Sequence, residues 1–164
     1  MEAKSLGEFS IFADYNMFFL LADTTTVPRV GPGLLTQLMT DLIAASPPGA
    51  VIVGTARRVT VPVTVDLRPD EPTKSEAAWD HIAEASIDTT SGVVRLVGDT
   101  SDPDNAATIT VPQGAYRVRV YSAGFDTLSD DGLDGDDHYR LVLWPAPAQP
   151  PRVVKRYPGE LPGG

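Results

Sequence analysis

The first third of the chain changes its hydrophobic pattern three times. Residues 9–21 are rich in Phe, Leu and Ile and predict one strand or a bulged pair of strands, bent near Asp14. Residues 24–33 are rich in Thr, Pro and Gly and predict a loop. Leucines and other apolar residues then recur at i, i+3, i+4 and i+7, which predicts a helix over about 34–45 that ends at Ser46-Pro47-Pro48-Gly49.

From residue 50 onward the apolar positions follow a period of two. In residues 59–67, Val and Leu at the odd positions alternate with polar residues, so one face of this strand is predicted to be buried. Pro62 has no N–H to donate, which predicts an edge strand or a bulge. Residues 88–92 (D-T-T-S-G) predict a hairpin turn between two strands. The further strands are predicted at 51–53, 79–87, 93–97, 108–111, 116–122 and 138–144.

These elements predict a mainly β fold. About eight strands and one short α-helix, with no helices between the later strands, favour an antiparallel β-sandwich over parallel βαβ units. Residues 1–144 are predicted to form a single domain. Residues 145–164 contain six prolines and no periodic pattern, which predicts an extended C-terminal tail.

The composition supports a single folded domain and excludes every function that needs cysteine. The chain has 164 residues, 14 glycines and 15 prolines, which suits short strands and many turns. It has no Cys, so disulfides, thiolate catalysis and Cys-ligated zinc are excluded. Residues 1–10 carry charges where a signal peptide would be apolar, and the longest apolar run, 17–22, is too short to span a bilayer. We therefore expect a cytoplasmic protein.

The charge balance is acidic. There are 13 Lys and Arg against 22 Asp and Glu, a net charge of −9. Such a chain repels nucleic-acid phosphates and anionic membranes, so neither is an expected partner. The same field favours a basic protein or a cation as partner.

Much of the negative charge lies in one predicted loop, residues 126–137, with a second acidic segment at 99–105. Three interpretations remain open for this loop: a solvated segment without a ligand, a surface that binds a partner protein, or a calcium site. Its spacing does not match an EF-hand. The candidate partner-binding residues are its aspartates, Asp126, Asp130, Asp131, Asp134, Asp136 and Asp137.

Other candidate chemistry is sparse. His81 falls on the apolar face of its strand and is predicted to be structural, whereas His138 follows two aspartates and resembles half of a carboxylate–histidine site. The serines lack a G-x-S-x-G elbow and the glycines form no phosphate loop. We therefore assign no catalytic residue, no metal ligand and no cofactor. A hydrolase that uses Asp or Glu with His138 is a third alternative, and it would need a pocket that brings His138 beside carboxylates.

Arginines cluster in the strand region. Arg117, Arg119 and Arg140 lie within predicted strands, with Arg57 and Arg58 at the start of another. Pairing with acids on neighbouring strands is the usual role of such residues. The alternative is a groove lined by Arg117, Arg119 and Arg140 that binds a carboxylate.

Several segments resemble the competence protein J family, which includes the inhibitor of the bacterial DNA-entry nuclease. The resemblance rests on F-S-I-F-A-D-Y-N-M-F-F-L-L-A-D (9–23), R-V-T-V-P-V-T-V (58–65), A-T-I-T-V-P-Q-G-A-Y-R-V-R-V-Y (107–121) and D-D-H-Y-R-L-V-L-W-P-A (136–146). Related bacterial proteins share W-D-H-I-A-E (79–84). The resemblance implies a small β-rich protein without enzymatic activity that binds and silences a nuclease. It supplies no inhibitory residues.

The sequence thus predicts a non-catalytic binding protein of the inhibitor or immunity type, which engages a basic protein through acidic loops. The alternative is a sandwich module that binds a cation or small ligand, with calcium in the 126–137 loop.

Overall fold

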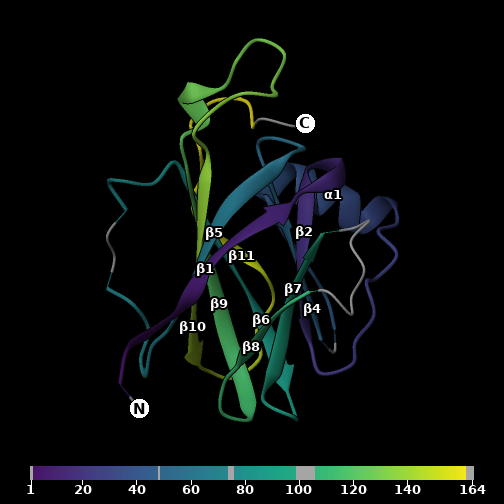
Figure 1. Ribbon diagram of the computed structural model, residues 1–164, viewed down its shortest axis with the longest axis vertical. Coiled ribbons are helices and arrows are strands. Elements are labelled where there is room, and N and C mark those ends of the chain that lie inside the picture. The colour runs from purple at the N-terminus through teal and green to yellow at the C-terminus, as the bar shows by residue number, and fades with distance from the viewer. Residues whose placement is uncertain (1, 48, 74–75, 99–105, 162–164) are drawn as a thin grey trace.

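In the part of the chain that the structure describes, two β-sheets and one α-helix make up the fold (Figure 1). The computed structural model describes residues 2–47, 49–73, 76–98 and 106–161, so the acidic segment 99–105 lies outside the described residues. One sheet has six strands in the order β1 (Lys4–Phe12), β5 (Thr60–Leu67), β10 (His138–Pro145), β9 (Gly114–Ala123), β6 (His81–Thr89) and β11 (Arg152–Lys155). The other has five, in the order β3 (Ile43–Ser46), β4 (Ala50–Gly54), β2 (Met17–Ala22), β7 (Val93–Gly98) and β8 (Ala107–Thr110).

The mainly β prediction is confirmed, but the described residues hold eleven strands rather than about eight. The added strands come from three places. The segment 9–21 is divided between β1 and β2, residues 43–46 form β3 instead of the end of a helix, and part of the proline-rich tail forms β11.

The division of the first segment has a backbone cause. A short 3-10 turn, η1 (Asp14–Asn16), separates β1 from β2, and Tyr15 and Asn16 adopt left-handed φ angles of 55° and 60° there. This turn carries the chain from the six-stranded to the five-stranded sheet. In β2 every residue is buried, because its two faces pack against different cores, which explains the unbroken apolar run of the sequence.

The helix is shorter than its apolar pattern predicts. α1 spans Pro32–Asp41, not 34–45, with Pro32 in the first turn. Leu42 ends it in a left-handed conformation (φ 58°), its N–H donating to the carbonyl of Leu38. Ile43 and Ala44 are buried in β3, so the apolar positions that look helical at this end are required by a sheet instead.

β5 shows the predicted alternation, with Val61, Val63, Val65 and Leu67 completely buried. The edge-strand prediction is wrong, because β5 lies between β1 and β10. Pro62 is tolerated because it stands opposite Ser10 of β1, one residue before the ladder with β10 begins at Val63. That ladder is parallel, whereas all other strand pairs are antiparallel in the described residues.

The turn at 88–92 does not form a hairpin. β6 belongs to the six-stranded sheet and β7 to the five-stranded sheet, so this turn is a crossover between them. Asp23 fixes it: its carboxylate accepts hydrogen bonds from the N–H groups of Thr90 (3.0 Å) and Ser91 (2.8 Å). Bonds from the hydroxyl of Ser91 and these N–H groups hold the pKa of Asp23 far below its ordinary value.

The main core is shared by the two sheets, with Phe18, Val63 and Leu141 among its fully buried members. A second core lies on the outer face of the five-stranded sheet, where Leu38 of α1 covers Phe19 and Ile52. No helix among the described residues is both long enough and apolar enough to cross a membrane.

The tail after β10 folds back onto the six-stranded sheet. β11 pairs with the edge of β6, with Arg152 opposite Glu84. Lys155 Nζ then donates to the carbonyls of Glu76 (2.9 Å) and Trp79 (2.7 Å), and Arg156 pairs with Asp41 at the end of α1 (2.8 Å).

Candidate functional site

The acidic loop (residues 126–137) connects β9 to β10 and projects from one end of the molecule (Figure 1). Hydrogen bonds across the loop define its shape. The N–H of Asp136 donates to Thr127 Oγ1 (2.7 Å), and Ser129 exchanges bonds with Asp134 through N–H to carbonyl (2.8 Å) and N–H to Oγ (2.9 Å). These hydrogen bonds define the conformation of the loop backbone, and with it the positions from which the aspartate side chains extend.

Five of its six aspartates are exposed to solvent, and none of the five forms an ion pair with a described residue. Within this group, the Asp131 carboxylate accepts bonds from the Ser129 hydroxyl (2.6 Å) and the Leu133 N–H (3.0 Å), which lower its pKa. The exposed five, hereafter the loop aspartates, are Asp126, Asp130, Asp131, Asp134 and Asp136.

Asp137 has a different environment, since it is completely buried. It pairs with Arg57 and accepts a hydrogen bond from the Tyr139 hydroxyl (2.6 Å), which in turn accepts one from the N–H of Ala56 (2.7 Å). Burial, with the Asp137 charge beside it, raises the pKa of Tyr139 well above its ordinary value. This network ties the C-terminal end of the loop to the 55–58 turn.

The N-terminal end of the loop is held separately. The N–H of Phe125 donates to the carboxylate of Asp80 (2.9 Å), and the Phe125 ring packs edge-on against Tyr157 of the tail at 5.2 Å between centroids. Gly124 has a φ of 82°, and a side chain there would collide with the backbone of Asp136. The loop is therefore anchored at both ends, by the contacts of Phe125 and by those of Asp137.

The two histidines lie in different surroundings. His81 is buried, with Nε2 at 2.6 Å from the Asp41 carbonyl and Nδ1 accepting the N–H of Tyr157 (3.2 Å), and burial lowers its pKa. This matches the structural role that the sequence predicts. His138 is exposed beside Trp79. Within the described ranges no three His, Asp or Glu side chains gather closely enough to hold a metal ion.

Four of the five arginines singled out in the strand region, Arg57, Arg117, Arg119 and Arg140, pair with acids, and Arg58 pairs with none of the described residues. Arg119 bonds to Glu84 directly across the β6–β9 pair (2.8 Å), and Arg140 pairs with Asp66 (2.6 Å). Arg117 also contacts Glu84 and donates to two carbonyls of the tail. The alternative of an open carboxylate-binding groove at Arg117, Arg119 and Arg140 is therefore not supported, because these guanidinium groups have partners within the chain.

Glu84 lies at the centre of a cluster of ion pairs that includes Arg117 and Arg119. Its carboxylate receives Arg117 (3.2 Å), Arg119 (2.8 Å) and Arg152 (2.8 Å), while its side chain is only 4% exposed. Burial alone would raise the pKa of Glu84, but the hydrogen bonds from the arginines outweigh it and lower the pKa.

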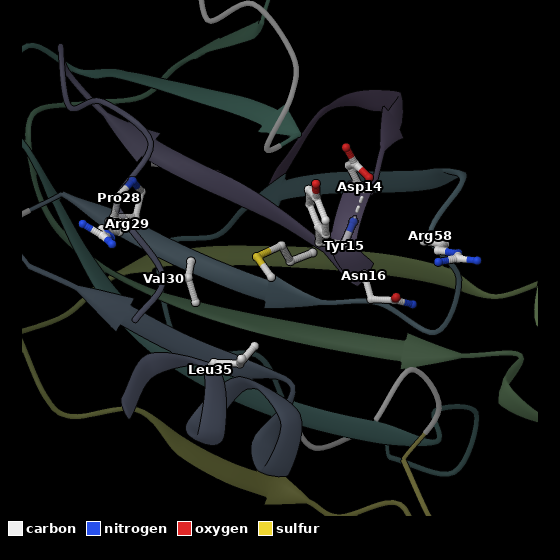
Figure 2. A pocket seen from close by; sticks show the side chains of 9 residues that line it. Asp14, Tyr15, Asn16, Pro28, Arg29, Val30, Leu35 and Arg58 are labelled. Atoms are coloured by element: carbon white, nitrogen blue, oxygen red, sulfur yellow. Dashed lines mark hydrogen bonds between the residues drawn. The ribbon is translucent and has the colours of Figure 1, made fainter. Parts of the chain in front are cut away.

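A groove that the sequence pattern did not reveal lies next to the 55–58 turn (Figure 2). It has a volume of about 760 Å³ and is lined by η1, the segment before α1, Leu35 of α1 and Arg58. These residues come from four separate stretches of the chain, so only the fold brings them together.

Comparison with known proteins gives a likeness of fold. No family model matches the chain, and no curated protein matches it. Among solved structures, the chain is similar to ComJ of Bacillus subtilis, an inhibitor of the DNA degrading activity of NucA. The TM-score is 0.70 at 14% identity, covering 89% of this chain and 100% of ComJ. It is also similar to Crocagin biosynthetic gene J, with a TM-score of 0.58 and 17% identity over 90% of this chain and 100% of that protein. The resemblance that the sequence predicts is confirmed at the level of the fold.

Proposed function

We propose that the protein is a non-catalytic binding protein of the inhibitor or immunity type. In this proposal it engages a basic protein, such as a nuclease, through the loop aspartates. The observation that carries the proposal is a set of five exposed carboxylates, unpaired among the described residues, on a loop with an internally bonded backbone. The fold shared with ComJ, itself a nuclease inhibitor, supports the inhibitor type.

The electrostatic argument follows from what a nuclease must bind. A groove that holds nucleic acid is lined with Lys and Arg, and carboxylates on another protein offer that groove the same sign of charge as phosphate. Complementary charge raises the association rate and makes it sensitive to salt. Because the loop is held at both ends and bonded across its middle, little conformational freedom is lost when it binds.

The non-catalytic part of the proposal rests on the state of the polar groups. His81 has both ring nitrogens engaged with backbone groups, and Asp137 is engaged by Arg57 and Tyr139. No hydrogen bond joins a serine hydroxyl to a histidine in the described residues, so the geometry gives nucleophilic catalysis no starting pair. Action in the cytoplasm is part of the same proposal, and fractionation of source cells tests it.

The test is capture of the partner, followed by an activity assay. The purified protein is immobilised and exposed to source-cell lysate at low and at high salt, and the bound proteins are identified by mass spectrometry. We expect a basic protein that elutes with salt. If it is a nuclease, its DNA degradation is then measured with and without the purified protein.

Two variants with equal net charge make the test specific for the loop. In one, the five loop aspartates are changed to Asn. In the matched control, five exposed acids elsewhere are changed to their amides: Glu2, Glu8, Asp70, Asp88 and Glu160. We expect the loop variant to lose binding and the control to keep it. Equal binding by both variants would remove the acidic loop from the proposal, and the absence of any basic partner would overturn it.

A further inference from the structure

The groove beside the 55–58 turn combines an apolar interior with two cationic sides. Its floor and walls include Met17, Val30 and Leu35, with the ring of Tyr15 standing at one side. Figure 2 shows Arg29 and Arg58 on opposite sides of this space, with Tyr15, Val30 and Leu35 between them. A volume of about 760 Å³ lies within the range of sites that hold small molecules or short peptide segments.

The two arginines differ from most others in the chain. Arg57, Arg117, Arg119, Arg140, Arg152 and Arg156 all form ion pairs. Arg29 and Arg58 are exposed and form none with any described residue. Asp14 is the one acid in the lining, and one of its oxygens already accepts the N–H of Tyr15 (3.0 Å). The groove is thus locally cationic in a chain whose net charge is −9.

Exposed apolar side chains also line the groove. Of the five large hydrophobic residues exposed in the described part of the chain, Tyr15 and Leu35 belong to its lining, at 66% and 40% exposure. Apolar surface that is grouped in this way, and rimmed by charge, marks interaction sites on soluble proteins.

The position of Tyr15 is enforced by its surroundings. Both Tyr15 and Asn16 have left-handed backbone, which is unfavourable for an aromatic residue. The Asn16 side chain donates to the carbonyls of Thr55 and Ala56 (both 3.3 Å), and the N–H of Thr55 donates to the carbonyl of Asn16 (2.9 Å). Backbone strain that is held in place by neighbouring bonds is typical of sites that present a side chain to a ligand.

We infer that this groove is a docking site for an extended peptide segment of a partner protein, one that carries an apolar side chain flanked by carboxylates. The apolar side chain packs among Met17, Val30 and Leu35, while the carboxylates reach Arg29 and Arg58. Charge complementarity selects this occupant, since two unpaired guanidinium groups favour an acidic segment and disfavour a basic one. The site is independent of the acidic loop, which presents the opposite charge.

The test selects peptides from a random library displayed on phage, using the full-length protein as bait. Selected peptides are then synthesised with a fluorescent label, and their affinity is measured by fluorescence polarisation. We expect the selected peptides to combine an aromatic or aliphatic residue with Asp or Glu. Enrichment of basic peptides, or no enrichment, would overturn the inference.

Variants identify the site. Arg29→Gln and Arg58→Gln should each weaken peptide binding about tenfold, the effect of losing one charge-assisted hydrogen bond. Lys4→Gln is the matched control, because Lys4 is exposed, forms no ion pair with a described residue and lies outside the groove. The Asn variant of the loop aspartates should bind the peptide no more weakly than the wild type, because the substitutions only remove negative charge that repels an acidic segment.

Hydrogen exchange supplies a readout that does not depend on variants. Bound peptide should slow amide exchange in residues 14–17 and 28–35. Protection confined to other segments, or equal weakening by Lys4→Gln, would show that the peptide binds elsewhere and would overturn the inference.

Discussion

The substitution Glu84→Gln offers the most direct quantitative test of how much the buried ion-pair cluster stabilises the fold. The Glu84 carboxylate pairs with three guanidinium groups, and the side chains of Arg117 and Arg119 are only 4% and 2% exposed. Glutamine keeps the size of the side chain and removes the charge, so buried Arg117 is left without an acid partner among the described residues and buried Arg119 keeps only the exposed Glu71. Breaking a buried ion pair from one side costs about 3–5 kcal/mol. The third partner, Arg152, is 58% exposed, so its pair with Glu84 adds at most about 1 kcal/mol.

We therefore expect the free energy of unfolding to fall by about 3–5 kcal/mol, measured by urea denaturation with tryptophan fluorescence and circular dichroism. The control is Glu71→Gln, which removes the other acid bound to Arg119; its side chain is 57% exposed, so the expected loss is about 1 kcal/mol or less. If Glu84→Gln costs no more than Glu71→Gln, the buried cluster does not stabilise the fold as argued.

The pH dependence of the same variant gives a second check. The arginines hold the pKa of Glu84 below its ordinary value of 4.5 in the folded state. The unfolded chain therefore takes up the proton first as the pH falls, so the stabilisation from Glu84 is present above pH 4.5 and is lost below it. The wild-type protein should lose stability more steeply with acid than Glu84→Gln, and parallel curves would contradict this assignment.

Four further outcomes are expected. Tyr139→Phe removes the hydroxyl between Ala56 and Asp137 and should cost about 2–4 kcal/mol in urea unfolding. Because the pKa of Tyr139 is raised in the folded state, the wild type should also lose stability above pH 10 more steeply than the Phe variant. Asp23→Asn removes one acceptor oxygen from the 88–92 crossover and should lower stability by about 1–2 kcal/mol, a difference that shrinks as the pH falls below about 4. Millimolar calcium should leave the melting temperature unchanged, whereas a rise of several degrees would revive the calcium-binding alternative.

The sequence was most informative where one local rule decides the structure. The alternation in 59–67 identifies β5 and its buried face, because a period of two has no helical solution. It could not place β5 in the sheet, since the neighbours of a strand come from distant parts of the chain. The same reason explains the error at 88–92, where a turn sequence typical of hairpins joins two different sheets.

The candidate site was predicted in composition but not in geometry. The six aspartates of residues 126–137 look alike in the sequence, yet Asp137 is buried. One signal could have separated it, because Asp137 continues the period-two face of Tyr139 and Leu141, which are buried in β10. The groove had no such signal. Its lining residues are unremarkable one by one, and the exposure of Tyr15 depends on backbone angles that no local pattern specifies.

The path of the tail determines where the protein can be labelled for these experiments. After β11, Tyr157 reaches the base of the acidic loop and packs against Phe125. In Figure 1 the segment after β11 runs toward the acidic loop, whereas β1 begins at the opposite end of the molecule. A purification tag or fluorescent fusion at the C-terminus would crowd the proposed binding surface, and an immobilised C-terminus would turn the loop toward the resin. An N-terminal tag leaves that surface open to an incoming partner.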